Sequence, residues 1–140
     1  MTFIDTNILL YAFGSGDGTD RPGIARQVLA RGDLAFSIQV FQEFHVQATS
    51  SRRVQPLTQA ESKEVIEALA EAFTVQVNDL AVFRTALEIQ VRYQTSFWDA
   101  NILAAARILG CSVVLSEDLN DRQDFGGVTV RNPFAEGYPA

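Results

Sequence analysis

The sequence predicts an α/β domain with a central, mostly parallel sheet of about five strands. Short apolar runs that fit buried strands alternate along the chain with longer segments of helical hydrophobic spacing. This alternation is typical of a parallel sheet whose strands are connected by helices. A chain of 140 residues fits one domain with a sizeable core, and it shows no internal repeat or linker, so we expect a single domain over residues 1–140.

Five short segments have the composition of buried strands. The clearest is 111–115, because it is almost entirely apolar, whereas 74–77 alternates between polar and apolar residues. The polar segment 116–127 is expected to be a loop. The expected strands are 2–4, 34–37, 74–77, 111–115 and 128–130.

Capping residues and helix breakers mark the ends of the expected helices. Pro22 suits the first turn of a helix that Gly32 ends, and Ser96 is placed to begin a later helix. Thr58 and Glu61 have the spacing of a capping box, in which each side chain bonds the backbone of the other. The expected helices are 7–13, 22–31, 38–51, 58–73, 79–93 and 96–109.

The composition excludes several classes of function. A net charge of −6 argues against a protein that wraps nucleic acid with a basic surface, although cations in an acidic pocket would offset part of that charge. No apolar run is long enough to span a bilayer, and the acidic start does not fit a signal peptide. Cys111 is the only cysteine, which suits a cytoplasmic protein. The glycine-rich segment 14–20 lacks a following Gly-Lys-Ser/Thr, so we expect a surface loop or flap there rather than a P-loop.

Four acidic residues fall at the carboxyl ends of expected strands or early in the helices that follow: Asp5, Glu43, Asp99 and Asp118. Ligands of parallel sheets bind beyond this edge. Each acid taken alone has an ordinary explanation. Asp5 can cap a helix, Glu43 can be a solvated helical acid, and Asp118 lies in an acid-rich loop. Asp99 can complete a capping box with Ser96.

The joint placement of these four carboxylates indicates a divalent metal site. Clustered carboxylates repel one another unless they are protonated or neutralised. Oxygen-only ligands suit Mg²⁺ or Mn²⁺, which can activate a water and stabilise the leaving oxygen in phosphodiester hydrolysis. His45 is the only histidine, so the chain offers too few nitrogen and sulfur ligands for a typical zinc site. We therefore predict a metal-dependent nuclease.

Five short motifs lie, in order, at 5–11, 40–44, 96–100, 115–119 and 130–134, and they span almost the whole chain. Together they resemble the motifs of PIN-domain ribonucleases, in particular the VapC-type toxins of bacterial toxin–antitoxin pairs. The resemblance implies a three-layer α/β/α PIN-like domain with Mg²⁺- or Mn²⁺-dependent endoribonuclease activity on RNA. It also implies a homodimer and inhibition by a small cognate antitoxin protein.

The resemblance assigns roles to particular residues. Asp5, Glu43, Asp99 and Asp118 are the expected catalytic acids, with Asp5, Asp99 and Asp118 as metal ligands and Glu43 acting directly or through water. Asn7 and Ser116 are expected to orient these ligands by hydrogen bonds without binding the metal themselves. Arg52 and Arg53 are candidates for binding the RNA backbone, as are Arg21 and Arg26. Whether Glu117 or Asp121 contributes to the site is left open by the sequence.

Two other functions are weighed against this one. An aspartyl phosphatase with Asp5 as nucleophile normally has a second aspartate two residues later, where this chain has Asn7. Its required lysine is also missing, since the only lysine, Lys63, lies in a charged helix. The other alternative is a catalytically weak PIN-like module that binds RNA or a protein partner.

Overall fold

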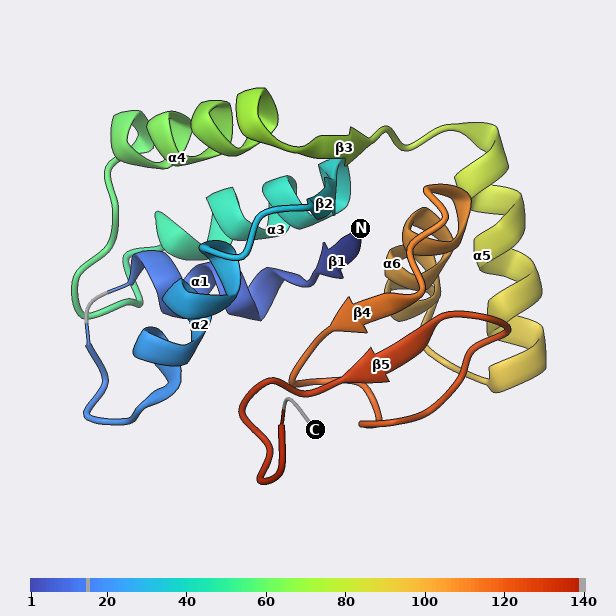
Figure 1. Cartoon of the computed structure of the whole chain (residues 1–140). Helices are drawn as coiled ribbons and strands as arrows, with labels where there is room; N and C mark the ends of the chain where they lie inside the picture. Colours follow the sequence, from blue (N-terminus) through green and yellow to red (C-terminus); the bar gives the residue numbers. More distant parts are fainter. Residues whose placement is uncertain (15, 139–140) are drawn as a thin grey trace.

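The computed structural model describes residues 1–14 and 16–138, and its centre is one parallel sheet (Figure 1). The strands lie in the order β3-β2-β1-β4-β5, and all four pairings are parallel. Their bounds are Thr2–Ile4 (β1), Leu34–Ser37 (β2), Thr74–Gln76 (β3), Val113–Leu115 (β4) and Thr129–Arg131 (β5). The predicted sheet of about five mostly parallel strands is confirmed.

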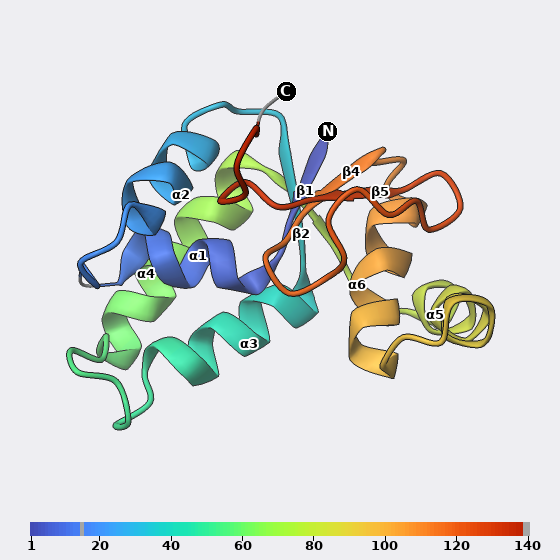
Figure 2. The same cartoon turned by 90° about the horizontal axis from the view of Figure 1, so that it is seen from below.

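Helices cover both faces of this sheet and produce three layers. Figure 2 shows α1 and α2 on one side of the strands and α5 and α6 on the other. In the described part of the chain the helices are Thr6–Phe13 (α1), Arg21–Leu29 (α2), Ile38–Ala48 (α3), Gln59–Ala72 (α4), Leu80–Tyr93 (α5) and Phe97–Ile108 (α6). None of these helices is long and apolar enough to cross a bilayer.

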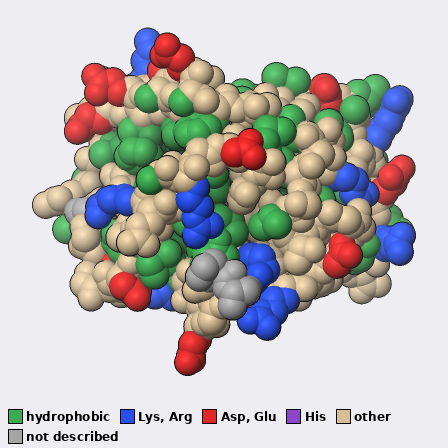
Figure 3. Space-filling model, in the orientation of Figure 1, with side chains coloured by type: hydrophobic (Ala, Val, Ile, Leu, Met, Phe, Trp, Pro, Cys, Tyr) green, Lys and Arg blue, Asp and Glu red, His purple; other side chains and the backbone are tan. Residues whose placement is uncertain are grey.

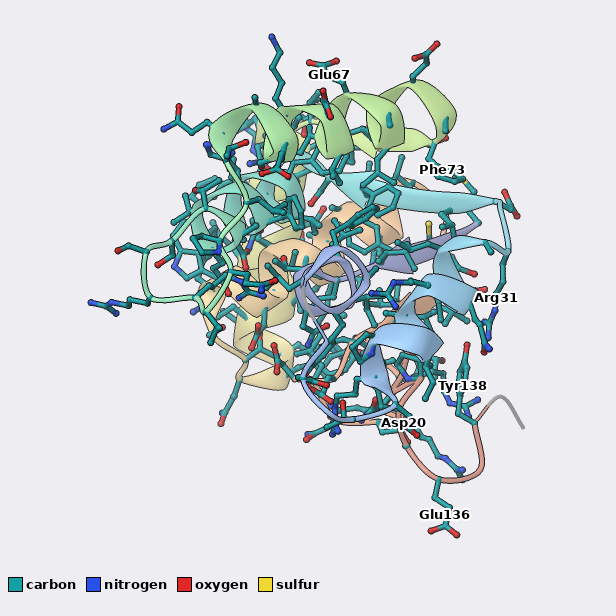
Figure 4. All side chains as sticks on the ribbon, turned by 90° about the vertical axis from the view of Figure 1, so that its left-hand side faces the viewer. Asp20, Arg31, Glu67, Phe73, Glu136 and Tyr138 are labelled. Carbon is teal, nitrogen blue, oxygen red and sulfur yellow. The ribbon has the colours of Figure 1, made fainter. Side chains whose placement is uncertain are left out.

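The predicted capping residues hold the helix starts in place. Thr58 and Glu61 form a complete capping box, with bonds of 3.0 Å and 2.9 Å between each side chain and the other's backbone. Acidic side chains gather at the top of Figure 3, over α4, where most residues are exposed. Glu67 points away from the ribbon there (Figure 4). Ser96 accepts a hydrogen bond from the Asp99 backbone N–H, so α6 begins as expected.

Some element ends differ from the prediction because side chains and turns take over the backbone bonds. The helix predicted to reach residue 51 ends at Ala48, since the Thr49 hydroxyl donates to the His45 carbonyl. The strand predicted from Cys111 begins at Val113, because the Cys111 N–H still bonds Ala106 at the end of α6. Of the loop predicted at 14–20, Ser15 lies outside the described residues, and the others contain neither helix nor strand.

The central strand β1 brings the start of the chain into the core. Phe3 and Ile4 are completely buried between β2 and β4. Beyond Ile4 the chain stays attached to the sheet, because the Asp5 backbone N–H donates to the Leu115 carbonyl at 3.0 Å. The carboxyl ends of β1 and β4 are therefore adjacent. At the end of β2, Ser37 caps α3 directly.

Candidate active site

The four predicted acids line one small pocket at the carboxyl edge of the sheet, which we call the acidic pocket. Its volume is ≈ 100 Å³. The end of β1 provides Asp5, α3 provides Glu43, the first turn of α6 provides Asp99, and the loop after β4 provides Asp118. Thr6, Asn7, Gln39 and Trp98 also contribute to its walls. The structure thus brings together side chains that are up to 113 residues apart in the sequence.

Asp5 is buried, and both of its carboxylate oxygens are bonded. The Thr6 N–H donates to Oδ1 and the Ser116 hydroxyl donates to Oδ2, each at 2.7 Å. Burial raises the pKa of Asp5 to about 6, and the negative charges of Glu43 and Asp118 add to this effect, against the two hydrogen bonds. Asp5 therefore caps α1 and at the same time presents its carboxylate to the pocket.

Ser116 links two of the acids from behind the pocket. It is completely buried, donates to Asp5, and accepts the Asp118 backbone N–H at 3.2 Å. One hydroxyl can donate once and accept twice, so both contacts are compatible. This bonding fixes the turn after β4 relative to the end of β1.

Glu43 is held by a different set of partners. The Gln39 amide donates to Oε1 at 2.7 Å, from one turn earlier on α3. The Thr6 hydroxyl donates to Oε2 at 3.3 Å, across from the start of α1. Glu43 is therefore not a freely solvated helical acid.

Asp99 and Asp118 face the same space with fewer constraints. The capping bond of Asp99 uses its backbone N–H, and no described residue donates a hydrogen bond to its carboxylate. The pKa of Asp118 is raised by burial first and then by the charges of Glu117 and Asp99, while the Asn7 amide acts in the opposite direction. The pocket thus concentrates negative charge that a cation would relieve.

Asn7 adds an observation that does not depend on charge. Its side-chain Nδ2 and Oδ1 are both buried, and neither has a hydrogen-bond partner of normal geometry among the described residues. Buried polar atoms are normally bonded, so an amide of this kind at a pocket wall is suited to bonding a ligand or a water in the pocket. Asn7 is also directed toward the region of Asp118.

These side chains fit a hydrated divalent cation. Within residues 1–14 and 16–138, no three His, Cys, Asp or Glu side chains are arranged to coordinate one ion among themselves. Mg²⁺ does not require such a cage, because it keeps several waters and uses one or two carboxylates. The four carboxylates, which offer only oxygen ligands, and the Asn7 amide at the pocket wall suit that mode of binding.

The structure separates the remaining candidates from the acidic pocket. Arg52 and Arg53 lie in the turn after α3, and neither lines it. Glu117 is turned to the other side, where Tyr11 and Arg21 donate to its two oxygens at 2.7 Å and 2.6 Å.

Three more residues have structural partners outside the acidic pocket. Asp121 accepts the Asn132 backbone N–H at 2.8 Å, and Arg26 donates to the Ala12 carbonyl at 3.1 Å. His45 bonds the hydroxyl of Ser62 at 2.9 Å. None of the three lines the acidic pocket, so none is a candidate ligand in this geometry.

Sequence reasoning missed several residues that line the acidic pocket, Thr6, Gln39 and Trp98 among them. A signal for Gln39 was present, because it precedes Glu43 by four residues and so shares its helix face. The contact of Thr6 with Glu43 joins residues 37 positions apart and has no local signal. The exposed position of Trp98 depends on how α6 packs.

The protein is thus an α/β protein with a parallel sheet and a pocket of acids at the carboxyl edge of that sheet. The chain belongs to the PIN-domain family, whose model matches residues 2–124. This confirms the predicted resemblance. The chain matches no curated protein sequence at a significant level.

Solved structures with the same fold include several toxins. A toxin–antitoxin complex from Klebsiella pneumoniae is similar with a TM-score of 0.72 and 20% identity, over 96% of this chain and 98% of that chain. VapC20 of Mycobacterium tuberculosis, a Sarcin-Ricin loop cleaving toxin, is similar with a TM-score of 0.67 and 23% identity, over 84% of this chain and 92% of that chain. VapBC2 from Rickettsia felis, bound to a DNA fragment of its promoter, is similar with a TM-score of 0.65 and 13% identity, over 94% of this chain and 97% of that chain. At these identities the likeness shows the fold.

Proposed function

We propose that this protein is an endoribonuclease that uses Mg²⁺ or Mn²⁺ to hydrolyse RNA phosphodiesters, as the toxin of a toxin–antitoxin pair. The observation that carries the proposal is the acidic pocket, where Asp5, Glu43, Asp99 and Asp118 meet at the carboxyl edge of the sheet. Membership of the PIN-domain family supports a nuclease. One toxin with the same fold cleaves the Sarcin-Ricin loop, which supports RNA as the substrate.

In this proposal Asp5, Asp99 and Asp118 would hold the ion, with Glu43 acting directly or through water. When bound, Mg²⁺ or Mn²⁺ supplies the positive charge that activates a water and stabilises the leaving oxygen. Ser116 keeps the Asp5 carboxylate oriented by donating to Oδ2. The Asn7 amide, at the pocket wall near Asp118, is placed to orient a water or phosphate oxygen in the pocket.

The surroundings of the acidic pocket suit a single RNA strand. A second, wider pocket of ≈ 370 Å³ adjoins it and shares Gln39, Glu43 and Trp98 with it. The Trp98 side chain is 66% exposed, although tryptophan usually buries most of its ring. An exposed aromatic ring beside a cleavage site can stack on a base of the bound strand. Arg52 and Arg53 are our proposed contacts to the RNA backbone further along.

Replacing Trp98 by alanine is expected to weaken RNA binding without changing metal binding. Loss of one stacked base corresponds to about 1–3 kcal/mol, or roughly a 5- to 150-fold rise in KM. Steady-state cleavage of a short single-stranded RNA measures this effect, with Mn²⁺ affinity as the internal control. An unchanged KM in the variant would remove Trp98 from the RNA-binding surface.

The proposed activity is tested by incubating an RNA panel of tRNA, rRNA and mRNA with antitoxin-free protein and Mg²⁺ or Mn²⁺. We expect cleavage by the wild type and a loss of at least about 100-fold in Asp99→Asn, since a ligand contributes several kcal/mol to stabilising the transition state. The variant keeps the backbone bond to Ser96 that begins α6. Equal cleavage by both proteins would refute the site, and no metal-dependent cleavage of any RNA would favour the binding-module alternative.

The proposed partners are a cognate antitoxin and a second copy of this chain. One solved structure with the same fold is a toxin–antitoxin complex, which supports the antitoxin. Support for the homodimer comes from α5, where four large apolar side chains at helical spacing are exposed by 42–80%: Leu80, Phe83, Leu87 and Val91. Helix α5 otherwise packs on α6, so this stripe is left for another molecule.

A further inference from the structure

Glu43 stands at one end of a buried chain of side-chain amides that the proposed mechanism does not use. We propose that Gln39 and Asn101 are positioning residues, which set the Glu43 carboxylate for binding a divalent cation. The inference deepens the proposed function and rests on it only for the identity of the ion. It concerns how the protein holds one of its acids, not which RNA it cleaves.

The chain of bonds runs from α6 to α3 in one direction. Asn101 Nδ2 donates to Gln39 Oε1 at 2.6 Å, and Gln39 Nε2 donates to Glu43 Oε1 at 2.7 Å. Gln39 Nε2 also reaches the Trp98 carbonyl at 3.2 Å. An ionised carboxylate only accepts hydrogen bonds, so Gln39 must turn its NH₂ group toward Glu43. Its oxygen then faces Asn101, which must present its own NH₂ group.

Both amide side chains of this chain of bonds are buried, so their hydrogen bonds are not a mobile surface contact. Gln39 is 4% exposed and Asn101 is 6% exposed. The neighbours of Asn101 on α6 are apolar and buried, Ala100, Ile102 and Leu103 among them. An amide in such a place costs free energy unless it is bonded, whereas an apolar pair of similar shape can be neutral or stabilising. The pair is therefore better explained by its effect on Glu43 than by core stability.

The amide chain also connects the two helices that carry two of the proposed metal-site acids. Gln39 belongs to α3, which carries Glu43, while Asn101 and the Trp98 carbonyl belong to α6, which carries Asp99. Two carboxylates that face one pocket repel each other before a cation arrives. The bonds to Gln39 hold Glu43 Oε1, so that Oε2 stays near Thr6 at the pocket wall. Groups that orient a ligand in this way typically change metal affinity by about 10- to 100-fold.

The first test is Asn101→Leu, which removes the donor and keeps a similar volume. We expect the dissociation constant for Mn²⁺, measured by electron paramagnetic resonance, to rise by about 10-fold or more. In RNA cleavage we expect kcat to fall while KM for RNA stays constant, because the RNA surface is intact. The double variant Gln39→Met with Asn101→Leu replaces the whole amide pair by apolar groups. Its melting temperature is expected to return to the wild-type value or above it, while Mn²⁺ binding stays weak.

Two controls separate positioning from a general structural role. Ser62→Ala breaks another side-chain hydrogen bond of α3, the one between His45 and the buried Ser62 hydroxyl, and Ser62 has no hydrogen bond to Glu43. It is expected to lower stability and leave Mn²⁺ affinity unchanged. In a double-mutant cycle, Asn101→Leu should add little to the loss of Mn²⁺ affinity already caused by Glu43→Gln, because both changes act through one carboxylate.

The proposal is overturned if Asn101→Leu binds Mn²⁺ as the wild type does, or if its effect adds fully to that of Glu43→Gln. It is also overturned if the wild type binds no Mn²⁺. A wild type that binds Mn²⁺ but cleaves no RNA would refute the proposed function alone, since the effect of Asn101 on Mn²⁺ affinity is measured without RNA.

Discussion

Asp5→Asn is expected to abolish metal-dependent RNA cleavage, with a loss of about 100- to 1,000-fold, while the protein remains folded. The amide keeps an oxygen that can accept from Thr6 or Ser116, so most of the helix cap survives. The variant loses the negative charge that would hold the cation. Asp5 thus separates the capping role from the proposed ligand role more cleanly than any other acid of the pocket.

Cleavage of a single RNA by the wild type and the variant, with circular dichroism of both proteins, measures this effect. Asp121→Asn is the matched control, because Asp121 lies outside the acidic pocket and uses its carboxylate to accept the Asn132 N–H. It is expected to retain nearly full activity. An Asp5→Asn protein that is unfolded would show that Asp5 is mainly a structural cap. A folded Asp5→Asn protein with full activity would remove Asp5 from the site.

The second large effect expected is a loss of stability of the metal-free protein as the pH rises from about 4 to above 6. Burial raises the pKa of Asp5 from 3.8 to about 6, so the neutral carboxyl is favoured in the folded state. Its contribution to stability is fully present below the unfolded pKa and is lost as the pH rises through the folded pKa. The difference corresponds to about 3 kcal/mol. The raised pKa of Asp118 acts in the same direction.

Urea unfolding in the presence of a chelator, at several pH values between 4 and 8, measures this dependence. Asp5→Asn cannot ionise, so its free energy of unfolding is expected to vary less with pH and to exceed that of the wild type at pH 8. Adding Mn²⁺ should restore stability to the wild type at pH 8 but not to the variant. If the free energy of unfolding of the wild type rose from pH 4 to pH 8, the raised pKa of the buried Asp5 would be contradicted.

The fold was predictable because its signals are local. Apolar runs, caps such as Thr58 and breakers such as Gly32 each act within a few residues, and together they place every helix and strand of the described structure. The observed ends of helices differ from the predicted ends where a side chain bonds the backbone. The Thr49 hydroxyl bonds the His45 carbonyl, and α3 ends three residues before its predicted end. Such competition between side chain and backbone depends on the turn that follows.

The site was predictable only in part. The four acids could be grouped because strand ends share one edge of a parallel sheet. Asn101 lies only two residues from Asp99, yet its bond to Gln39 joins residues 62 positions apart and follows only from the placement of α6 beside α3. The same holds for Glu117, whose position beside Asp118 in sequence did not reveal that Tyr11 and Arg21 hold it elsewhere.

The most direct test of the central claim combines two titrations on one protein sample. Mn²⁺ binding at pH 7.5 is followed by electron paramagnetic resonance, and RNA cleavage is followed over the same Mn²⁺ concentrations. If the acidic pocket is a cation site for RNA hydrolysis, half-maximal binding and half-maximal cleavage will coincide, and Asp5→Asn will lose both. Cleavage without a divalent ion, or equal Mn²⁺ binding by Asp5→Asn and the wild type, would contradict the account.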